Sequence, residues 1–216
     1  MRFSRELLKL YSNNIPLKYK LYTLIRCAIC PFIEIEKYVP PDGKILDFGC
    51  GHGLFANLLA LKSNSKDVIG IDINAQKINI AKRTLGVRKN IDFRIGDLES
   101  CFHIPGINCF IFIDVLNCVP VKKQKESLRR LYSILQDDGM VIIKSIQEFP
   151  NWKYWWTLFH MAVIEKVVHK NFKKNSYFIK KEDFLMLLEE IGFKVQFKDL
   201  SKGYTYSHCL YVCSKA

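Results

Sequence analysis

The sequence predicts an α/β fold: a Rossmann-like, mostly parallel sheet of seven strands with an antiparallel C-terminal strand and helices on both faces. Three observations predict it. Short apolar segments alternate with amphipathic ones from residue 44 onward, most strands are apolar almost throughout, and too few residues for a helix separate the last two strands. Continuous apolar strands are typical of a parallel sheet covered on both faces. A connection that short joins antiparallel neighbours.

The alternating part follows a strong turn motif, Pro40-Pro41-Asp42-Gly43, and the helical segment before it is interrupted at Pro16. Apolar runs and helical periodicity then predict the elements in turn. The expected strands are Lys44–Phe48, Val68–Asp72, Ile91–Ile95, Cys109–Asp114, Met140–Ile146, about 193–199 and about 206–213. The expected helices are Leu54–Lys62, Ala75–Leu85, Lys122–Leu135 and Glu182–Ile191, with a long helical segment over 151–172.

Two basic segments stand out from this pattern. Residues 1–43 predict a basic N-terminal helical cap, and residues 44–216 predict one domain with a helical insertion at about 150–181. The net charge is +12, of which residues 1–30 supply +5 and residues 151–181 supply +6. A concentrated basic field indicates an anionic partner, such as lipid headgroups, nucleic acid or an acidic carrier protein. Lysines that only keep the surface soluble are the alternative.

The insertion combines an apolar stripe with a group of lysines. The stripe at helical spacing consists of Trp152, Trp155 or Trp156, Phe159, Val163 and Val167, and the lysines include Lys166, Lys170, Lys173 and Lys174. Aromatic residues beside lysines suit a membrane interface or the wall of an apolar substrate pocket. A core-facing stripe with a solvated lysine face is the alternative.

No run of the sequence is long enough to span a bilayer. The longest charge-free runs, 48–61 and 100–113, have 14 residues each, whereas a spanning helix needs about 18 or more. The eight cysteines are scattered and no secretory leader is evident, which indicates reduced thiols. We therefore expect a cytoplasmic protein, and the sequence leaves open a peripheral contact with the anionic inner face of the membrane.

A glycine-rich loop, Phe48-Gly49-Cys50-Gly51-His52-Gly53, joins the first strand to the first helix of the domain. Glycines let the backbone pass close to a ligand, and the helix after them presents N–H groups to something anionic. The nicotinamide fingerprint would require glycine at position 54, which is Leu54 here. Asp47 before the loop suits a cationic ammonium rather than a pyrophosphate. A ligand with an ammonium and a carboxylate in one group is an amino acid.

Two further acids follow the next two strands. Asp72 closes the second strand, where an acid accepts hydrogen bonds from a ribose diol. Gly96-Asp97-Leu98 closes the third strand, where a carboxylate or the neighbouring amide can bind an adenine edge. Because the carboxyl ends of parallel strands meet at one edge, we expect these acids and Asp47 to line one crevice.

With these motifs the sequence resembles the class I S-adenosylmethionine-dependent methyltransferases, over about residues 40–216. The resemblance implies S-adenosyl-L-methionine as cofactor and methyl transfer as the reaction. By it, Asp47, Gly49 and Gly51 would hold the methionyl part, Asp72 the ribose hydroxyls, Asp97 with Leu98 the adenine, and Asp114 would lie near the methionyl group and the reaction centre; Cys50, Gly53 and Ile73 complete the implied cofactor site.

Three shorter motifs are more narrowly similar to small bacterial methyltransferases of aryl-polyene and related lipid-like biosynthetic clusters. They are Cys50-Gly-His-Gly-Leu-Phe55, Asn151-Trp-Lys-Tyr154 and Gly203-Tyr-x-Tyr-x-His208. The similarity implies a small hydrophobic acceptor, aromatic or acyl, which an acyl carrier protein can present. In methyltransferases with this layout, the N-terminal cap and the insertion together roof the substrate site.

The sulfonium cofactor is already activated, so catalysis is mainly in-line placement of the acceptor and exclusion of water. An oxygen or ring-carbon nucleophile also needs a proton removed. The candidate catalytic residues are His208 as base, Tyr204 and Lys144 as positioning groups, and Glu148 on the same rim. The acceptor, the atom methylated and the oligomeric state are left open.

Other classes are weighed against this interpretation. Amino-methylating DNA enzymes carry an Asn/Asp-Pro-Pro-aromatic tetrad where this chain has Asp114-Val-Leu-Asn117. An RNA methyltransferase stays an alternative, although nucleic acid is not the expected partner because no RNA-binding module accompanies the core. A non-catalytic cofactor-binding interaction protein is the other alternative. We expect no metal site, because no carboxylate cluster follows Asp114 and the pair Cys27 and Cys30 has no second pair at zinc spacing.

Overall fold

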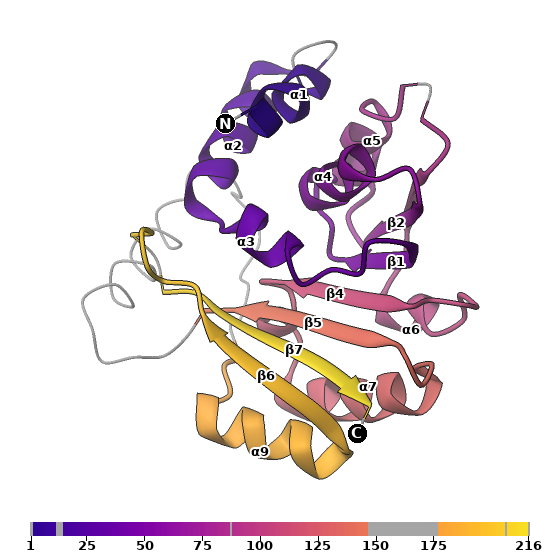
Figure 1. Cartoon of the computed structure of the whole chain (residues 1–216). Helices are drawn as coiled ribbons and strands as arrows, with labels where there is room; N and C mark the ends of the chain where they lie inside the picture. Colours follow the sequence, from indigo (N-terminus) through magenta and orange to yellow (C-terminus); the bar gives the residue numbers. More distant parts are fainter. Residues whose placement is uncertain (1, 12–14, 87, 147–176, 206, 216) are drawn as a thin grey trace.

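The computed structural model describes residues 2–11, 15–86, 88–146, 177–205 and 207–215 (Figure 1). These residues form one seven-stranded sheet in the order β3-β2-β1-β4-β5-β7-β6. The strands are β1 (Gly43–Phe48), β2 (Lys66–Asp72), β3 (Ile91–Ile95), β4 (Cys109–Ile113), β5 (Met140–Ser145), β6 (Phe193–Asp199) and β7 (Cys209–Lys215). Strands β1 to β5 pair in parallel, and β7 runs antiparallel to both of its neighbours, β5 and β6. The predicted fold class is confirmed.

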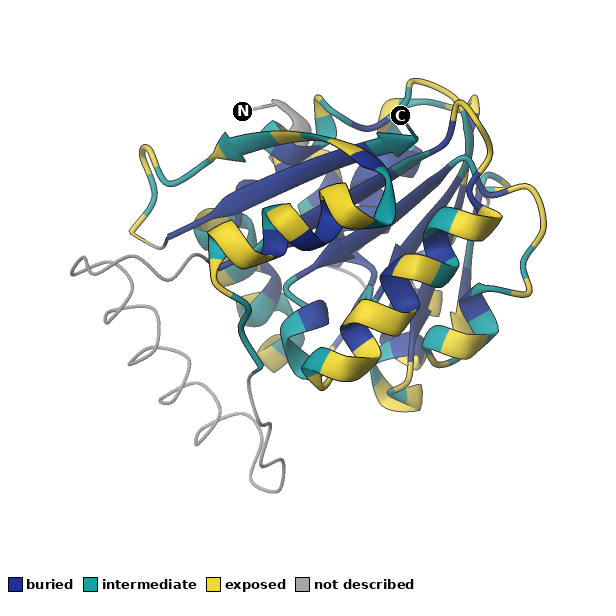
Figure 2. Cartoon of the chain, turned by 90° about the horizontal axis from the view of Figure 1, so that it is seen from below, coloured by how far each residue is buried: buried dark blue, intermediate teal, exposed yellow. Residues whose placement is uncertain are grey.

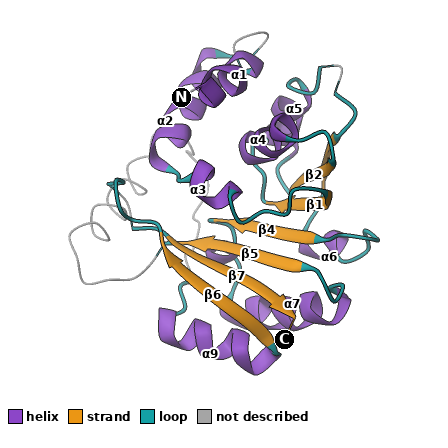
Figure 3. Ribbon diagram, in the orientation of Figure 1, coloured by secondary structure: helices purple, strands orange, loops and turns teal. Residues whose placement is uncertain are grey.

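Helices cover both faces of the sheet (Figure 3). They are α1 (Arg2–Leu10), α2 (Leu17–Ile29), α3 (Phe32–Glu36), α4 (Leu54–Lys62), α5 (Ala75–Lys82), α6 (Leu98–Cys101), η1 (Leu116–Cys118), α7 (Val121–Ile134) and α9 (Lys181–Ile191). Alternate strand residues point to opposite faces and enter two separate cores. Ile45 packs with the face that carries α1, α3, α4 and α5, and Leu46 packs with the face that carries α6, α7 and α9.

Most predicted elements match the observed ones within two residues. Two ends differ, each for a local reason. The helix expected over Ala75–Leu85 ends at Lys82, because the next amides bond to carbonyls three residues back, as in Thr84 N to Ala81 O (2.9 Å). The last strand begins at Cys209 rather than near 206, since Ser201 and His208 bond to each other and close the hairpin loop before it. The short helices α6 and η1 were not predicted, whereas α3 lies within the segment expected to be helical before Pro40.

The surface helices show the usual division between a buried and an exposed side. In α7 the buried residues are Gln124, Ser127, Leu128 and Leu131, and in α9 they are Phe184, Leu187 and Leu188. Figure 2 shows the helices nearest the viewer with exposed positions outward and buried positions toward the sheet. Burial of an apolar side holds such a helix on the sheet.

The N-terminal helices pack against the rest of the fold, with α1 contacting both α2 and α4. Leu7 and Tyr11 are buried in the same core as Leu58 of α4. Figure 1 shows α1–α3 beside α4, at the end of the sheet where the arrowheads of β4 and β5 lie. The division at residue 43 stays a prediction, and the helical segment expected over 151–172 lies outside the described residues.

Candidate functional site

The glycine-rich loop is a tight turn that only glycine accommodates at its alternate positions. Gly49, Gly51 and Gly53 have φ angles of 72°, 57° and 79°, a region that L side chains rarely adopt. A Cβ on Gly49 would lie 2.5 Å from the side chain of Val115, and a Cβ on Gly53 would lie 2.5 Å from the ring of Phe93. A Cβ on Gly51 would meet nothing within 4 Å. Gly51 is therefore the loop position that faces open space.

Asp72 ties this loop to the end of β2. Its carboxylate accepts hydrogen bonds from the Gly51 amide (2.9 Å) and the Asn74 amide (2.8 Å) and is buried. A carboxylate has about four lone-pair positions, so two further donors can still bind it. The neighbouring Ile73 side chain is 76% exposed. At the end of β3, the exposed Asp97 accepts a hydrogen bond from the Ser100 amide (3.0 Å) and begins α6, whose first residue is Leu98.

Asp47 lies buried beneath the loop at the end of β1. Within the described residues its Oδ2 atom has no hydrogen-bond partner. Burial raises the pKa of Asp47 to about 7; a hydrogen bond from the Ala56 backbone opposes this effect, and the nearby charge of Asp72 adds to it. A cation placed beside Asp47 would stabilise its charged form.

These residues fit S-adenosyl-L-methionine. The unpartnered Oδ2 of Asp47 suits an ammonium, the bare backbone at Gly51 admits a close approach, and Asp72 keeps acceptor capacity for a diol. The exposed apolar side chain of Ile73 offers a surface to a flat base. The residues implied by the resemblance for the first three strands therefore lie along one edge of the sheet.

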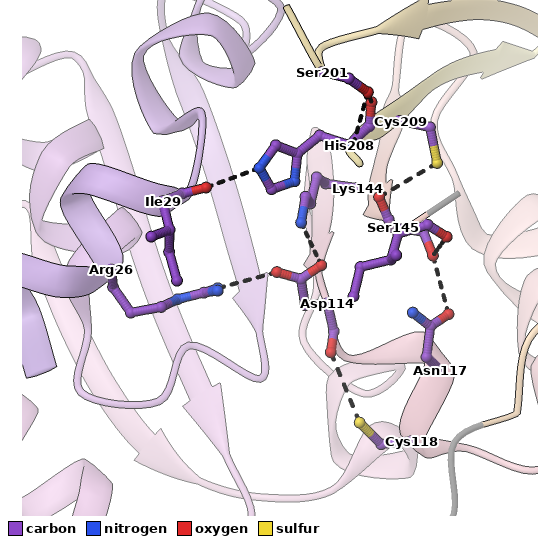
Figure 4. A network of polar contacts seen from close by, with 11 residues as sticks. Arg26, Ile29, Asp114, Asn117, Cys118, Lys144, Ser145, Ser201, His208 and Cys209 are labelled. Carbon is purple, nitrogen blue, oxygen red and sulfur yellow. Dashed lines mark hydrogen bonds and ion pairs between the residues drawn. The ribbon is translucent and has the colours of Figure 1, made fainter. Parts of the chain in front are cut away.

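Asp114 has a different environment, because ion pairs hold it from two sides (Figure 4). Its carboxylate contacts Arg26 of α2 (3.1 Å) and Lys144 of β5 (2.5 Å). Burial alone would raise the pKa of Asp114, but the charges of Lys144 and Arg26 hold it well below its usual range. Asp114 also has a positive φ of 56°, which is uncommon for a residue with a side chain. Its two cations keep this carboxylate charged at neutral pH.

The predicted catalytic residues gather around this network. His208 is buried, and its Nε2–H donates to the Ile29 carbonyl at the end of α2 (2.8 Å). Burial and the nearby charge of Lys144 lower the pKa of His208 to about 3. The half-buried Tyr204 ring meets the His208 ring edge-on at 5.3 Å, and burial raises the pKa of Tyr204. Their catalytic roles stay predictions.

A second set of contacts joins the cap to the glycine-rich loop. The Tyr11 hydroxyl of the cap donates to the His52 carbonyl (2.7 Å) and accepts from the Asn57 side chain (3.1 Å). The rings of Tyr19 and Tyr22 lie 5.0 and 4.9 Å from the His52 ring. The cap thus contacts both the loop and the Asp114 network.

Sequence reasoning missed Tyr11, Arg26 and the Ile29 carbonyl as parts of this site. Arg26 carried a usable signal, because it is a lone charge in the apolar run Leu24 to Ile29, and a buried charge requires a partner. Tyr11 carried none, since a tyrosine among apolar helix residues is usual in a core. Glu148 and the residues predicted for the insertion stripe and its lysines lie outside the described residues.

A small recess of about 20 Å³, room for about one water molecule, opens at the carboxyl ends of β4 and β5. It is lined by Leu116, Asn117, Gln124, Ile143, Ser145, Ile146, Ile179, Lys181, Phe184 and Tyr211. The Ser145 hydroxyl donates to the Asn117 side chain (3.0 Å) at its edge. Lys144 and Ser145 are consecutive, so the recess and the Asp114 network lie on opposite faces of the same strand end.

A family model described as a methyltransferase domain matches residues 41–192, more than two thirds of the 216 residues. This chain belongs to the methyltransferase-domain family. The predicted recognition as an S-adenosylmethionine-dependent methyltransferase is therefore confirmed at the level of the family. S-adenosyl-L-methionine is the cofactor of this family, as predicted. The narrower resemblance to enzymes of aryl-polyene clusters stays a prediction.

Curated relatives share part of their length with this methyltransferase domain. The ribosomal protein L11 methyltransferase of Ruminiclostridium cellulolyticum is 25% identical over 127 residues, covering 54% of this chain and 40% of that protein. The carboxy-S-adenosyl-L-methionine synthase of Campylobacter hominis is 29% identical over 110 residues, covering 50% of this chain and 47% of that protein. The matches thus span less than half the length of these relatives.

Solved methyltransferase structures share the fold at low sequence identity. Magnesium protoporphyrin IX methyltransferase (ChlM) from Synechocystis PCC 6803 with bound SAH has a TM-score of 0.64 at 18% identity, covering 96% of this chain and 92% of that one. The S-adenosylmethionine-dependent methyltransferase SibL has a TM-score of 0.69 at 18% identity, covering 99% of this chain and 61% of that one. At these identities the likeness shows the fold alone.

The described part of the chain contains neither a membrane-spanning helix nor a metal-binding cluster. Among the described residues, no helix has the length and apolar character needed to cross a membrane. Within the same residues, no three His, Cys, Asp or Glu side chains form a group that could hold a metal ion. All eight cysteines, Cys27 and Cys30 included, are free thiols.

Proposed function

We propose that this protein transfers a methyl group from S-adenosyl-L-methionine to a small hydrophobic acceptor, aromatic or acyl, in a biosynthetic pathway. The observation that carries the proposal is the bond from the Gly51 amide to Asp72, which faces open space where a Cβ would meet no atom within 4 Å. It joins the loop that a methionyl group would approach to the acid that a ribose would meet. The methyltransferase family supports the same reaction.

The chain's own residues would bind and orient the reactants. The cofactor supplies an electrophilic methyl group, and Asp47 and Asp72 would hold its ammonium and its diol. Arg26 and Lys144 keep Asp114 charged and fixed in place. His208, with a pKa of about 3, is neutral at pH 7 and a weak base, which favours a role in holding the cap over the site. Tyr204 is the half-exposed candidate for contact with the acceptor.

The acceptor class rests on the three short motifs that resemble small bacterial methyltransferases of aryl-polyene and related lipid-like biosynthetic clusters. The net charge of +12 also suits an acceptor presented on an acidic carrier protein.

The cofactor part is tested by calorimetric titration with S-adenosyl-L-methionine. We expect Gly51→Leu to weaken binding at least about a hundredfold, because the new side chain fills the space that the ligand needs. Gly86→Leu is the matched control: Gly86 has the same φ of 57° and also has no atom within 4 Å of a built Cβ. Backbone strain of about 1–2 kcal/mol is then common to both variants. Equal affinities in both variants would contradict the proposed cofactor site.

The acceptor part is tested by incubating the protein with methyl-labelled S-adenosyl-L-methionine and a cell extract. We expect the label in the fraction that extracts into organic solvent, either directly or after cleavage from a carrier protein. Label that stays in RNA, or that stays in protein after the carrier-bound product has been cleaved off, would contradict a hydrophobic acceptor. It would still be consistent with methyl transfer.

A further inference from the structure

Helix α2 turns an apolar side toward the solvent. Leu17, Leu21, Leu24 and Ile25 are 79%, 57%, 49% and 42% exposed. Their spacing of four, three and one residues places them on one stripe of an α-helix, and the exposed Ala28 continues it. Single exposed apolar residues are normal, but a continuous stripe marks an interaction surface.

The polar and aromatic residues of α2 point the other way. Arg26 reaches Asp114, Tyr22 meets the His52 ring, and the buried Thr23 donates to the Tyr19 carbonyl (2.8 Å). This arrangement is the reverse of α7 and α9, whose apolar residues face the sheet. The outward stripe of α2 is therefore not needed for packing against the described residues.

Two lysines border the stripe. At 100° per residue, Lys18 and Lys20 fall on opposite sides of the line through Leu17, Leu21 and Leu24. Lys18 is exposed, and its amine lies 4.8 Å from the ring of Tyr19. An apolar stripe between lysines complements a surface with an apolar interior and anionic headgroups.

We propose that the outward face of α2, made of Leu17, Leu21, Leu24 and Ile25 between Lys18 and Lys20, docks on an anionic lipid membrane. The helix has 13 residues and a length of about 20 Å, too short to span the hydrocarbon core of about 30 Å but suited to lie in its surface. The lysine amines would lie among the headgroups while the leucines enter the acyl boundary. The inference is independent of the proposed methyl transfer.

Charge favours a membrane over the protein alternatives. A second copy packed on the same face would bring Lys18 and Lys20 against their equivalents, in a protein with a net charge of +12. The chain's own residues 151–181 have an apolar stripe of their own, but they also carry seven lysines and one glutamate, so covering the α2 stripe with that segment would bring like charges together. Anionic lipid is the occupant that complements both the leucines and the lysines.

Docking through α2 would also bring the Asp114 network close to the membrane, because the opposite side of the same helix contacts that network. The helix that would lie on the bilayer also supplies Arg26 to Asp114 and the Ile29 carbonyl to His208. A single helix thickness, about 10 Å, would separate the membrane surface from this network.

The test measures co-sedimentation with vesicles of equal parts phosphatidylcholine and phosphatidylglycerol, without cofactor. We expect the double variant Leu21→Gln/Leu24→Gln to bind about a hundredfold more weakly, since each leucine contributes about tenfold or more. The control is Met186→Gln/Ile134→Gln, which removes exposed apolar residues from α9 and α7 (54% and 40% exposed) and is expected to bind like the unchanged protein. The variant Lys18→Gln/Lys20→Gln is expected to lose about tenfold on these vesicles and nothing on phosphatidylcholine alone.

Three results would overturn the proposal. One is equal partitioning of the leucine variant and its control. Another is a dimer of the unchanged protein in solution that the leucine variant dissociates, which would make the face a contact between copies. The third is a fall in thermal midpoint of the leucine variant alone, with no vesicles present, which would mean that the chain itself covers the face. Cofactor titration of the same variants keeps these outcomes separate from the proposed reaction.

Discussion

The two halves of the candidate site are built in different ways. At the ends of β1 to β3, polar groups bond mainly to backbone amides close by, as Asp72 does with Gly51 and Asn74. At the ends of β4 and β5 and just before the start of β7, side chains meet residues far away in the sequence. Arg26 and Asp114 are 88 residues apart, and His208 and Ile29 are 179 apart. The first half is a local motif, and the second exists only once the topology is complete.

This difference separates polar groups that a ligand can bind from polar groups that are paired within the protein. In the half at the ends of β1 to β3, Asp47 Oδ2 and Asp72 can each accept a further hydrogen bond, which a ligand can donate. The other half satisfies its charges internally through Arg26 and Lys144. We therefore expect changes in the second half to act mainly on folding, and changes in the first half to act on cofactor binding as well as on stability.

The largest effect is expected from Lys144→Met. Lys144 is 2% exposed and pairs with Asp114, so removing its amine leaves a half-buried carboxylate with one cation. The free energy of unfolding should fall by about 3–5 kcal/mol, measured by urea denaturation. The control Arg94→Met breaks an exposed ion pair with Asp92 and should cost under about 1 kcal/mol. An equal fall in unfolding free energy for Lys144→Met and Arg94→Met would show that the Asp114 ion pair contributes no more to stability than an exposed ion pair does.

An intermediate effect is expected from Asp47→Asn, and it depends on pH. The folded pKa of about 7 lies above the unfolded value of about 4, so between these values the folded protein holds a proton that the unfolded chain has lost. Stability contributed by that proton is present in acid and is lost as the pH rises through 7. The free energy of unfolding of Asp47→Asn should thus exceed that of the unchanged protein by on the order of 2–4 kcal/mol at pH 8, and this difference should vanish near pH 4.

Thermal or urea unfolding across this pH range measures the effect. Asp67→Asn, at an exposed position of the same sheet on β2, controls for loss of a surface carboxylate. The Asp47→Asn variant should also bind S-adenosyl-L-methionine more weakly, because the amide of asparagine cannot balance the ammonium charge of the ligand. A gain at pH 8 that persists at pH 4 would contradict the assigned pKa.

The smallest effect is expected from Tyr11→Phe, which touches both halves through the cap. Loss of the hydroxyl leaves the His52 carbonyl and the Asn57 amide each without one partner and should cost about 1–3 kcal/mol in unfolding free energy. Tyr22→Phe is the control, since it keeps the ring contact with His52. Cofactor titration completes the measurement: an affinity loss in Tyr11→Phe alone would show that the cap orders the loop.

The fold was predictable because its signals are local and repeated. Apolar strands such as Cys109–Ile113 and turn residues such as Pro40 to Gly43 mark the elements without knowledge of the tertiary structure. The short connection before β7 even indicated the reversed strand. The short helices α6 and η1 were missed, because three or four residues carry no helical periodicity.

The site was predictable only where it is local. Asp72 ends its strand and Gly51 lies three residues after the end of β1, so their positions could be inferred from spacing. The ion-pair partners of Asp114 could not be inferred, since no pattern in the sequence around Asp114 indicates a contact with Arg26 or Lys144. His208 was singled out as a base from its residue type, whereas its burial and its bond to Ile29 depend on the packing of the cap.

The placement of β7 has a consequence for how the protein is made. Although last of the strands, it lies between β5 and β6, and His208 immediately before it reaches the carbonyl at the end of α2. The cap, the glycine-rich loop and the five parallel strands therefore leave the ribosome before β7 is made. Until then the nascent chain has an open β5 edge and a cap that lacks its contact with His208, which is the state that chaperones would encounter.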